Sequence, residues 1–226
     1  MKHIPKSRIG KLGFTLMELL VVIALVAILV TVMVPVVLKA MKGKGLSMIG
    51  NNIAGFVAFS RTEAMNTRQT HVIVFYVDRQ SLSTDSGLPL DIGPGMALYR
   101  INPNATGDDK TINYVKQLDF TGTIGGDVNF ADAWQREAQT GPILGLHESA
   151  NKEFAGKYKI AILPDGRLLI PEDKPGYVLD EGKTKGIKTD LILTDDGERY
   201  VFIDFNSATG AVKRSKVVNR EDTDWP

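Results

Sequence analysis

The sequence predicts an α+β protein in which a long N-terminal transmembrane α-helix continues into a helix packed on an antiparallel β-sheet domain. Three observations support this prediction. A basic N-terminus precedes an apolar run that is long enough to cross a bilayer. After that run, apolar residues recur every three or four positions, as on one face of a helix. The rest of the chain alternates short β-rich segments with turn sequences, and a long helix on antiparallel strands makes an α+β domain.

Length and composition limit the classes of protein that fit. The chain has 226 residues, 43% apolar and 23% charged, so we expect one anchored domain or at most two small ones. The formal net charge is +1, and the first 13 residues contribute four cations and no anion. Without those four, 23 basic residues face 26 acidic ones, so the bulk charge gives no reason to expect a nucleic-acid partner. The absence of cysteine excludes disulfides and cysteine-based metal or catalytic sites.

The apolar run covers Leu19–Leu38, and Thr31 is its only polar residue. Its 20 residues would form a helix about 30 Å long, which matches the hydrocarbon core of a bilayer. Pro35 should bend this helix near its far end rather than stop it. The basic residues ahead of the run predict a cytoplasmic N-terminus and an outward-facing remainder by the positive-inside rule.

Glu18 is the unusual feature of this segment, because a carboxylate inside a bilayer costs about 2.5–3.5 kcal/mol. A cleaved secretory signal would have a shorter apolar region and a small-residue cleavage site, which the sequence after Pro35 lacks. A plain signal anchor fits the length of the run but leaves Glu18 unexplained. Such a carboxylate usually has a functional partner, and no basic residue lies within the apolar run.

The stretch Gly13–Glu18, G-F-T-L-M-E, resembles the class III signal of type IV prepilins and type II secretion pseudopilins. The resemblance implies that a prepilin peptidase removes a leader by cutting after Gly13, and that Phe14 becomes the N-methylated first residue. It also implies that Glu18 pairs with the free amine of a neighbouring subunit. Pro35 falls where the family often has a helix-bending proline. The implied partners are the prepilin peptidase, other pilin or pseudopilin subunits, the inner-membrane assembly platform and membrane lipid.

Residues 39–70 are expected to form the amphipathic second half of the long helix, with one apolar stripe that lies against a sheet. Gly43 and Gly45 should make its start flexible, since each weakens a helix by about 1 kcal/mol relative to alanine. The stripe consists of Leu46, Ile49, Ile53, Phe56, Val57 and Ala64. The polar face consists of Asn51, Asn52, Ser60, Arg61, Glu63 and Arg68.

Short β-branched and aromatic segments predict a β-rich outer domain over residues 71–226. The predicted strands are His71–Val77, Met96–Ile101, Thr111–Val115, Tyr158–Leu163, Arg167–Ile170, Asp190–Leu193, Arg199–Phe205 and Ala211–Val218. Hairpin turns are predicted at Pro164-Asp165-Gly166, Asp195-Asp196-Gly197 and Thr209-Gly210. The stretch 79–157 is expected to be an exposed insertion with a short helix near Ala131–Ala138. The predicted organisation is a leader at 1–13, a membrane and assembly helix at 14–38, the amphipathic half at 39–70, and this domain.

Further segments resemble the GspH/FimT-like minor subunits of the same family. Arg61, Glu63 and Ala64 match three positions of the signature A-R-S-E-A. The sequences I-L-P-D-G-R-L-L-I at 162–170 and F-I-D-F-N-S-A-T-G-A-V-K-R at 202–214 resemble the later hairpin and the closing strand of that group. The resemblance implies a single-pass protein of the bacterial cytoplasmic membrane. Its C-terminal domain would be periplasmic or extracytoplasmic, and the subunit would enter a pseudopilus or pilus after assembly.

No catalytic or metal-binding set stands out in the sequence. His71 opens a predicted strand and is expected at the surface or at a sheet edge. His147-Glu148 begins a pattern like H-E-x-x-H, but Asn151 replaces the second histidine, so no zinc protease site is predicted. The acidic residues of the late loops do not complete a calcium loop. We therefore expect neither an enzyme nor a bound cofactor or metal.

A basic stretch near the C-terminus keeps a second function open. Lys213, Arg214, Lys216 and Arg220 crowd into eight residues, and some FimT-like proteins of competence pili bind DNA through such a stretch. Cations that neutralise phosphates would give salt-sensitive binding. Against this, three acidic residues follow immediately, and no aromatic residue stands between the cations as a stacking surface for bases. Lysines on an exposed edge strand, where charge hinders pairing with another chain, would account for the same residues.

The function predicted is that of a minor pilin-like structural subunit of a type II secretion pseudopilus or a type IV pilus. Two alternatives remain open at this point: a DNA-binding minor pilin of a DNA-uptake pilus, and a plain signal-anchored extracytoplasmic protein.

Overall fold

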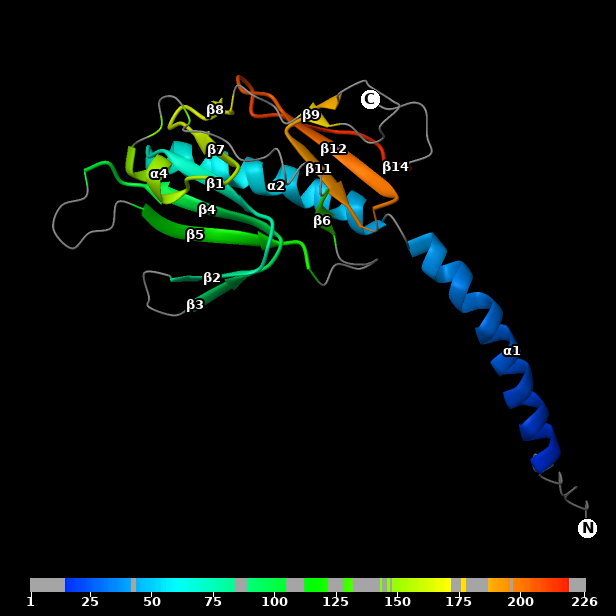
Figure 1. Ribbon diagram of the computed structural model, residues 1–226. Coiled ribbons are helices and arrows are strands. Elements are labelled where there is room, and N and C mark those ends of the chain that lie inside the picture. Colours follow the sequence, from blue (N-terminus) through cyan, green and yellow to red (C-terminus); the bar gives the residue numbers. More distant parts are fainter. Residues whose placement is uncertain are drawn as a thin grey trace, which may run out of the picture. The chain divides into compact units, whose positions relative to one another are not determined.

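Two compact units make up the chain, Met1–Ala40 and Met41–Pro226. A computed structural model describes residues 15–41, 44–83, 89–104, 112–121, 128–131, 143, 146, 148–171, 176–177, 187–195 and 197–219. Figure 1 shows the helices and strands of both units. Gly13, Phe14 and Arg220 lie outside the described residues, as does most of the helix expected near Ala131–Ala138.

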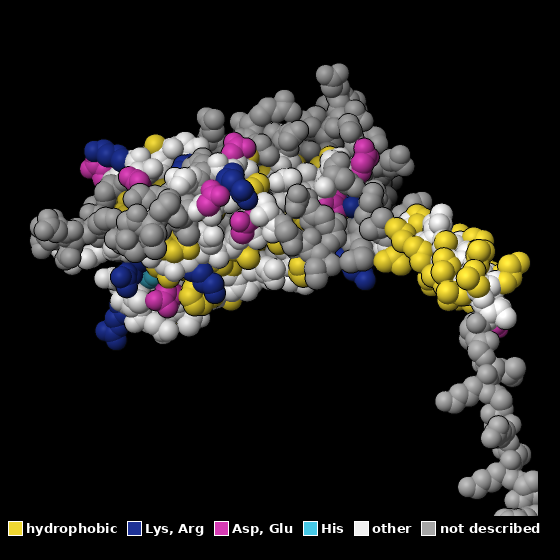
Figure 2. Space-filling model, turned by 90° about the horizontal axis from the view of Figure 1, so that it is seen from below, with side chains coloured by type: hydrophobic (Ala, Val, Ile, Leu, Met, Phe, Trp, Pro, Cys, Tyr) yellow, Lys and Arg dark blue, Asp and Glu magenta, His cyan; other side chains and the backbone are white. Residues whose placement is uncertain are grey.

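The helix α1, Leu16–Met41, accounts for nearly all of the described part of the first unit. Its segment Leu16–Pro35 is the one stretch of the described chain that is long and apolar enough to cross a membrane, as an anchor or a signal sequence does. Every described side chain of this segment is exposed, and Figure 2 shows its almost uniformly hydrophobic surface. Pro35 lies inside the helix and does not end it, as predicted.

The helix α2, Lys44–Thr67, opens the second unit and is amphipathic, as predicted. All six residues of the predicted apolar stripe are buried. Ser60, expected on the polar face, is buried as well, because its hydroxyl donates to the Phe56 carbonyl at 2.7 Å and so needs no water. Gly45, expected in a flexible stretch, lies in the first turn of α2 and is buried.

The first sheet is antiparallel and has the strand order β5-β4-β1-β7-β8. Its strands are β1 (His71–Tyr76), β4 (Gly95–Ile101), β5 (Ile112–Asp119), β7 (Lys159–Ile162) and β8 (Leu168–Leu169). The central strand β1 is buried along its whole length, which explains its unbroken apolar sequence after His71. His71 is thus fully buried in a central strand, and the expectation of a surface or edge position is wrong.

The second sheet is also antiparallel, with the order β13-β12-β11-β6 and with β14 paired to β12. Its strands are β6 (Asn129–Phe130), β11 (Leu191–Thr194), β12 (Arg199–Phe205), β13 (Val212–Arg214) and β14 (Val218–Asn219). Two small ribbons complete the described strands: β2 (Gln80–Ser83) with β3 (Pro89–Ile92), and β9 (Gly176–Tyr177) with β10 (Ile187–Lys188). Helix and antiparallel strands together confirm the α+β class.

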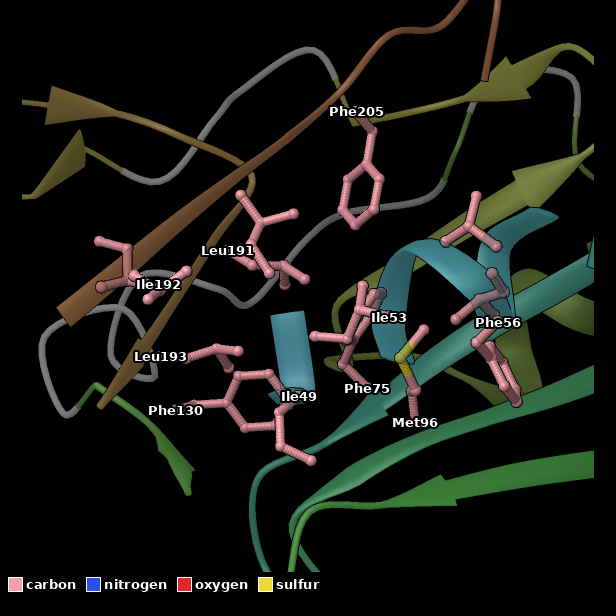
Figure 3. Packing of buried hydrophobic residues seen from close by; sticks show 14 of the residues in the cluster. Ile49, Ile53, Phe56, Phe75, Met96, Phe130, Leu191, Ile192, Leu193 and Phe205 are labelled. Carbon is pink, nitrogen blue, oxygen red and sulfur yellow. The ribbon is translucent and has the colours of Figure 1, made fainter. Parts of the chain in front are cut away.

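The main hydrophobic core lies between α2 and both sheets. In Figure 3, Ile49 and Ile53 of α2 lie among side chains of the first sheet, such as Phe75, and side chains of the second, such as Leu193. A second cluster covers the opposite face of the first sheet, where residues of α4 (Glu148–Glu153) and Phe154 pack against Tyr99. The first sheet is therefore covered on both faces, and α2 joins the two sheets into one unit.

The stretch 79–157 was expected to be an exposed insertion, and the strands predicted within it at Met96–Ile101 and Thr111–Val115 correspond to β4 and β5. Its strand β4 is buried at six of seven positions and pairs with β1, and β5 pairs with β4. Ala131 is buried and donates its N–H to the Ile192 carbonyl at 3.0 Å, so it extends the β6 pairing. The expectation of an exposed position is wrong for β4, which is buried, whereas β5 is half-buried at the edge of the first sheet.

Candidate assembly site

Thr15 sets the start of α1. Its hydroxyl accepts a hydrogen bond from the Glu18 N–H at 3.2 Å, and its carbonyl accepts one from the Leu19 N–H at 3.1 Å. These are the bonds of an N-cap residue, and Thr15-x-x-Glu18 also has the spacing of a capping box. Glu18 therefore lies in the first turn of the helix, where a carboxylate interacts favourably with the helix dipole.

Glu18 is the one charged residue in the segment Leu16–Leu38. The only other hydrogen-bonding side chain of that segment, Thr31, donates its hydroxyl to the Ala27 carbonyl at 2.8 Å, so it needs no external partner. The Glu18 residue is exposed, within a surface that is otherwise apolar. In hydrocarbon this carboxylate would need a cation as its partner, and the segment Leu16–Leu38 supplies none. The predicted processing residues Gly13 and Phe14 lie outside the described residues.

Arg61 of α2 joins two hairpin turns that belong to different sheets. Its Nε–H donates to the Gly166 carbonyl at 2.8 Å, in the turn between β7 and β8. The same side chain lies against Gly210, in the turn between β12 and β13, where a Cβ would overlap Arg61 Cδ and Nε. We call Arg61, Gly166 and Gly210 the turn clamp. It brings together the three segments on which the GspH/FimT resemblance rests.

The local geometry of both clamp turns requires glycine. Gly166 has φ 83° and Gly210 has φ 64°, which is the left-handed region that glycine adopts without strain. Gly210 donates its N–H to the Asn206 carbonyl at 2.7 Å, and Asn206 closes the hairpin by donating to the Ala211 carbonyl. Leu168 of β8 donates to the Ser207 carbonyl at 2.9 Å, a direct backbone bond between the two hairpins. The predicted turns are thus confirmed, and they also hold the sheets together.

A buried carboxylate makes a second joint between the sheets. Asp190, fully buried, accepts a hydrogen bond from the Phe205 N–H at 2.7 Å and one from the Tyr158 hydroxyl at 3.4 Å. Tyr158 directly precedes β7, and Phe205 ends β12. Burial, and then the neighbouring Asp190, raise the pKa of the Tyr158 hydroxyl well above its usual value, so this phenol stays a neutral donor.

Arg214 turns toward α2 and away from solvent. Its Nη1 donates to the Ser47 hydroxyl at 2.7 Å and to the Ser47 carbonyl at 3.1 Å. Gly50, one turn later on α2, makes room for the arginine, because a Cβ there would lie 2.5 Å from Arg214 Cδ. This contact ties β13 to the helix and explains Arg214 without a nucleic-acid partner.

The structure describes three of the four predicted DNA-contact residues. Lys213 and Lys216 are exposed, Arg214 is bonded to Ser47, and Arg220 lies outside the described residues. Of the acidic residues near the late turns, Asp195 is paired with Arg199, mostly out of solvent. No cluster of three or more His, Cys, Asp or Glu side chains occurs in the described part of the chain.

Sequence reasoning missed the contact between Arg61 and Gly210 and the capping role of Thr15. A signal for each was present: Thr15 and Glu18 have capping-box spacing, and Arg61 and Gly210 both belong to motifs of one family resemblance. Nothing in the sequence indicated that Asp190 would connect the two sheets through hydrogen bonds. No family model, curated protein or solved structure matches this chain.

Proposed function

We propose that this chain is a minor pilin-like structural subunit of a type II secretion pseudopilus or a type IV pilus. The single observation that carries the proposal is Glu18. It is an exposed carboxylate at the start of an apolar helix, and it ends the G-F-T-L-M-E sequence in which a prepilin peptidase would cut after Gly13. Cleavage after Gly13 would create an ammonium group on Phe14 at the membrane edge, and Glu18 of a neighbouring copy would neutralise it.

The rest of the chain supports this role without a catalytic step. The apolar helix α1 would hold the subunit in the bacterial cytoplasmic membrane with its N-terminus on the cytoplasmic side, and would form the core of the assembly. The α2 helix with its two antiparallel sheets would be the outer domain of such a subunit. That domain would face the periplasm and contact other subunits.

Processing by a prepilin peptidase tests the proposal. The full chain would be expressed with and without the peptidase, and the mass of its N-terminal peptide measured. We expect the peptidase to remove residues 1–13 and to leave Phe14 with one added methyl group. The matched control is Gly13→Leu, in which a bulky residue replaces glycine at the scissile bond, and it should keep the leader. Retention of residues 1–13 by the unmodified chain in the presence of active peptidase would overturn the proposal.

The DNA-binding alternative has less support, because Arg214 is held by Ser47 and only Lys213 and Lys216 of the predicted set are exposed in the described part of the chain. Two exposed cations predict weak binding with only a modest dependence on salt, because the slope scales with the number of phosphates neutralised. Titration of residues 41–226 with duplex DNA at two salt concentrations separates the alternatives. Micromolar binding that disappears in the Lys213→Ala, Lys216→Ala double variant would favour DNA uptake over a purely structural role.

A further inference from the structure

His71 is the first residue of β1, and its imidazole lies inside the domain. The side chain is fully buried, and β1 has a strand on each side: Arg100 of β4 and Ile162 of β7 are the register partners of His71. Histidine has an unperturbed pKa close to neutral pH, so its charge changes in mildly acidic solution. A buried histidine in a central strand is therefore a group through which acid can act on the fold.

A hydrogen bond fixes which ring nitrogen of His71 carries the proton. Nδ1 lies 3.0 Å from the Gln69 carbonyl, and a carbonyl oxygen only accepts, so Nδ1 is the protonated nitrogen. Nε2 is then the atom that would take up a second proton. It is buried and has no hydrogen-bond partner within the described part of the chain. An imidazolium in this position would have an N–H without an acceptor, which is costly inside a protein.

The charged groups that face the imidazole do not remove this cost. Burial lowers the pKa of His71 and is the largest effect. The bond to Gln69 and the Glu63 carboxylate of α2 raise this pKa, whereas Arg100 of β4 lowers it. Neither Glu63 nor Arg100 bonds to Nε2, and β7 places the apolar Ile162 at the paired position. The folded arrangement therefore favours the neutral imidazole.

His71 lies at the end of β1 that adjoins the connection from α2. This connection consists of residues 68–70, and Arg68 within it has φ 53°, in the left-handed region that residues other than glycine rarely adopt. The Ile101 N–H attaches the connection to β4 by donating to the Thr70 carbonyl at 2.8 Å. Connecting segments open locally at a lower free energy than the centres of core strands. Movement of the connection would thus expose Nε2 while both sheets stay folded.

We propose that proton uptake by His71 opens the connection between α2 and β1, so that this junction is an acid-sensitive switch within the domain. At neutral pH the uncharged imidazole is buried and bonded to the Gln69 carbonyl. In acid the imidazolium is stable only where water or a carboxylate accepts a hydrogen bond from Nε2, which requires the connection to move. The switch concerns the domain alone and does not depend on cleavage after Gly13 or on assembly.

Hydrogen exchange of the full-length chain in detergent micelles tests the switch at two amides. The Ile101 N–H reports on the connection, and the Phe75 N–H, which donates to the Tyr158 carbonyl at 3.0 Å, reports on the other end of β1. Between pH 7 and pH 5, the protection of Ile101, corrected for the intrinsic effect of pH on exchange, should fall by about tenfold, because the open state binds the proton more tightly. Phe75 should keep its protection. Equal losses at both amides, or unchanged protection of Ile101, would overturn the proposal.

The matched variant is His71→Asn. The asparagine amide can donate to the Gln69 carbonyl as Nδ1 does, but it does not titrate. Ile101 should then have the same corrected protection at pH 7 and pH 5. A loss in this variant as large as in the unmodified chain would show that another group carries the response, and would overturn the assignment to His71. If the variant fails to fold, the comparison of Ile101 with Phe75 in the unmodified chain still decides whether acid opens the connection alone.

Discussion

Removal of the Arg61 side chain should show how much of the domain's stability depends on the turn clamp. Arg61 donates one charge-assisted hydrogen bond, to the Gly166 carbonyl at 2.8 Å, and packs its stem against Gly210. A hydrogen bond from a charged donor contributes about 1.5–3 kcal/mol, and loss of the packed stem adds to that cost. Arg61→Ala should therefore lower the free energy of unfolding by about 2–3 kcal/mol.

The assay is urea and thermal unfolding of residues 41–226, which contain all of α2 and both sheets. For a domain of this size, 1 kcal/mol corresponds to roughly 2–4 °C in Tm, so Arg61→Ala should lower Tm by roughly 5–10 °C. The matched control is Arg79→Ala. Arg79 makes an exposed ion pair with Asp91 at 3.7 Å, and its loss should change stability by less than about 0.5 kcal/mol.

A double-mutant cycle with Gly210→Ala tests the clamp itself. In the unmodified chain, Gly210→Ala combines strain at φ 64° with overlap against Arg61. In the Arg61→Ala background the overlap is gone and only the backbone strain, about 1–2 kcal/mol, remains. The two changes should therefore be less harmful together than the sum of the single effects, by about 1 kcal/mol or more. Additivity within about 0.5 kcal/mol would refute the contact between Arg61 and Gly210.

Three further predictions concern single residues. The Glu18→Ala variant should insert in the membrane as the unmodified chain does, but it should enter assemblies poorly. The measurement is the amount of subunit that pellets with sheared filaments. Unchanged incorporation would contradict the pairing of Glu18 with a neighbouring N-terminus. Gly55→Ala should raise the stability of residues 41–226 by about 0.5–1 kcal/mol in urea unfolding, whereas Gly50→Ala, which meets Arg214, should lower it. Burial lowers the pKa of the His71 imidazole below its ordinary 6.5. As the pH falls from 6.5 toward this lowered pKa, the unfolded chain binds a proton at His71 and the folded chain does not. The contribution of the neutral His71 to stability is therefore complete above pH 6.5 and is lost in this window. Replacement by asparagine should flatten the dependence of Tm on pH in that window, and an unchanged slope would contradict a neutral buried imidazole.

The elements that the sequence predicted well depend on local patterns. The apolar run of α1, the stripe of α2 and the turn at Pro164-Asp165-Gly166 each involve neighbours within a few positions. Strands β1, β7, β11 and β12 were predicted within about two residues at each end. These segments fold as expected because the spacing of apolar residues and the residue preferences of turns depend only on positions close together in the chain.

The errors occur where tertiary packing overrides the local pattern. His71 is polar, yet it lies in a central strand where its Nδ1 is 3.0 Å from the Gln69 carbonyl. Ser60 is buried because its hydroxyl bonds to its own helix. The predicted strand Ala211–Val218 is two strands, β13 and β14, which both pair with β12 and are separated by residues 215–217. The pattern of polar and apolar residues within a strand does not predict which other strand it will pair with.

By itself the sequence determined a membrane-length apolar helix with a carboxylate at its start, an amphipathic second helix and the α+β class. Only the tertiary structure decided that the strands divide between two sheets, that Arg61 holds a turn 105 positions away, and that Arg214 bonds to a serine 167 positions away. The physical reason is the distance along the chain between the interacting residues. Helix period and hairpin turns depend on neighbours in the chain, whereas the partner of a half-buried arginine depends on which distant atoms the hydrophobic core brings within reach.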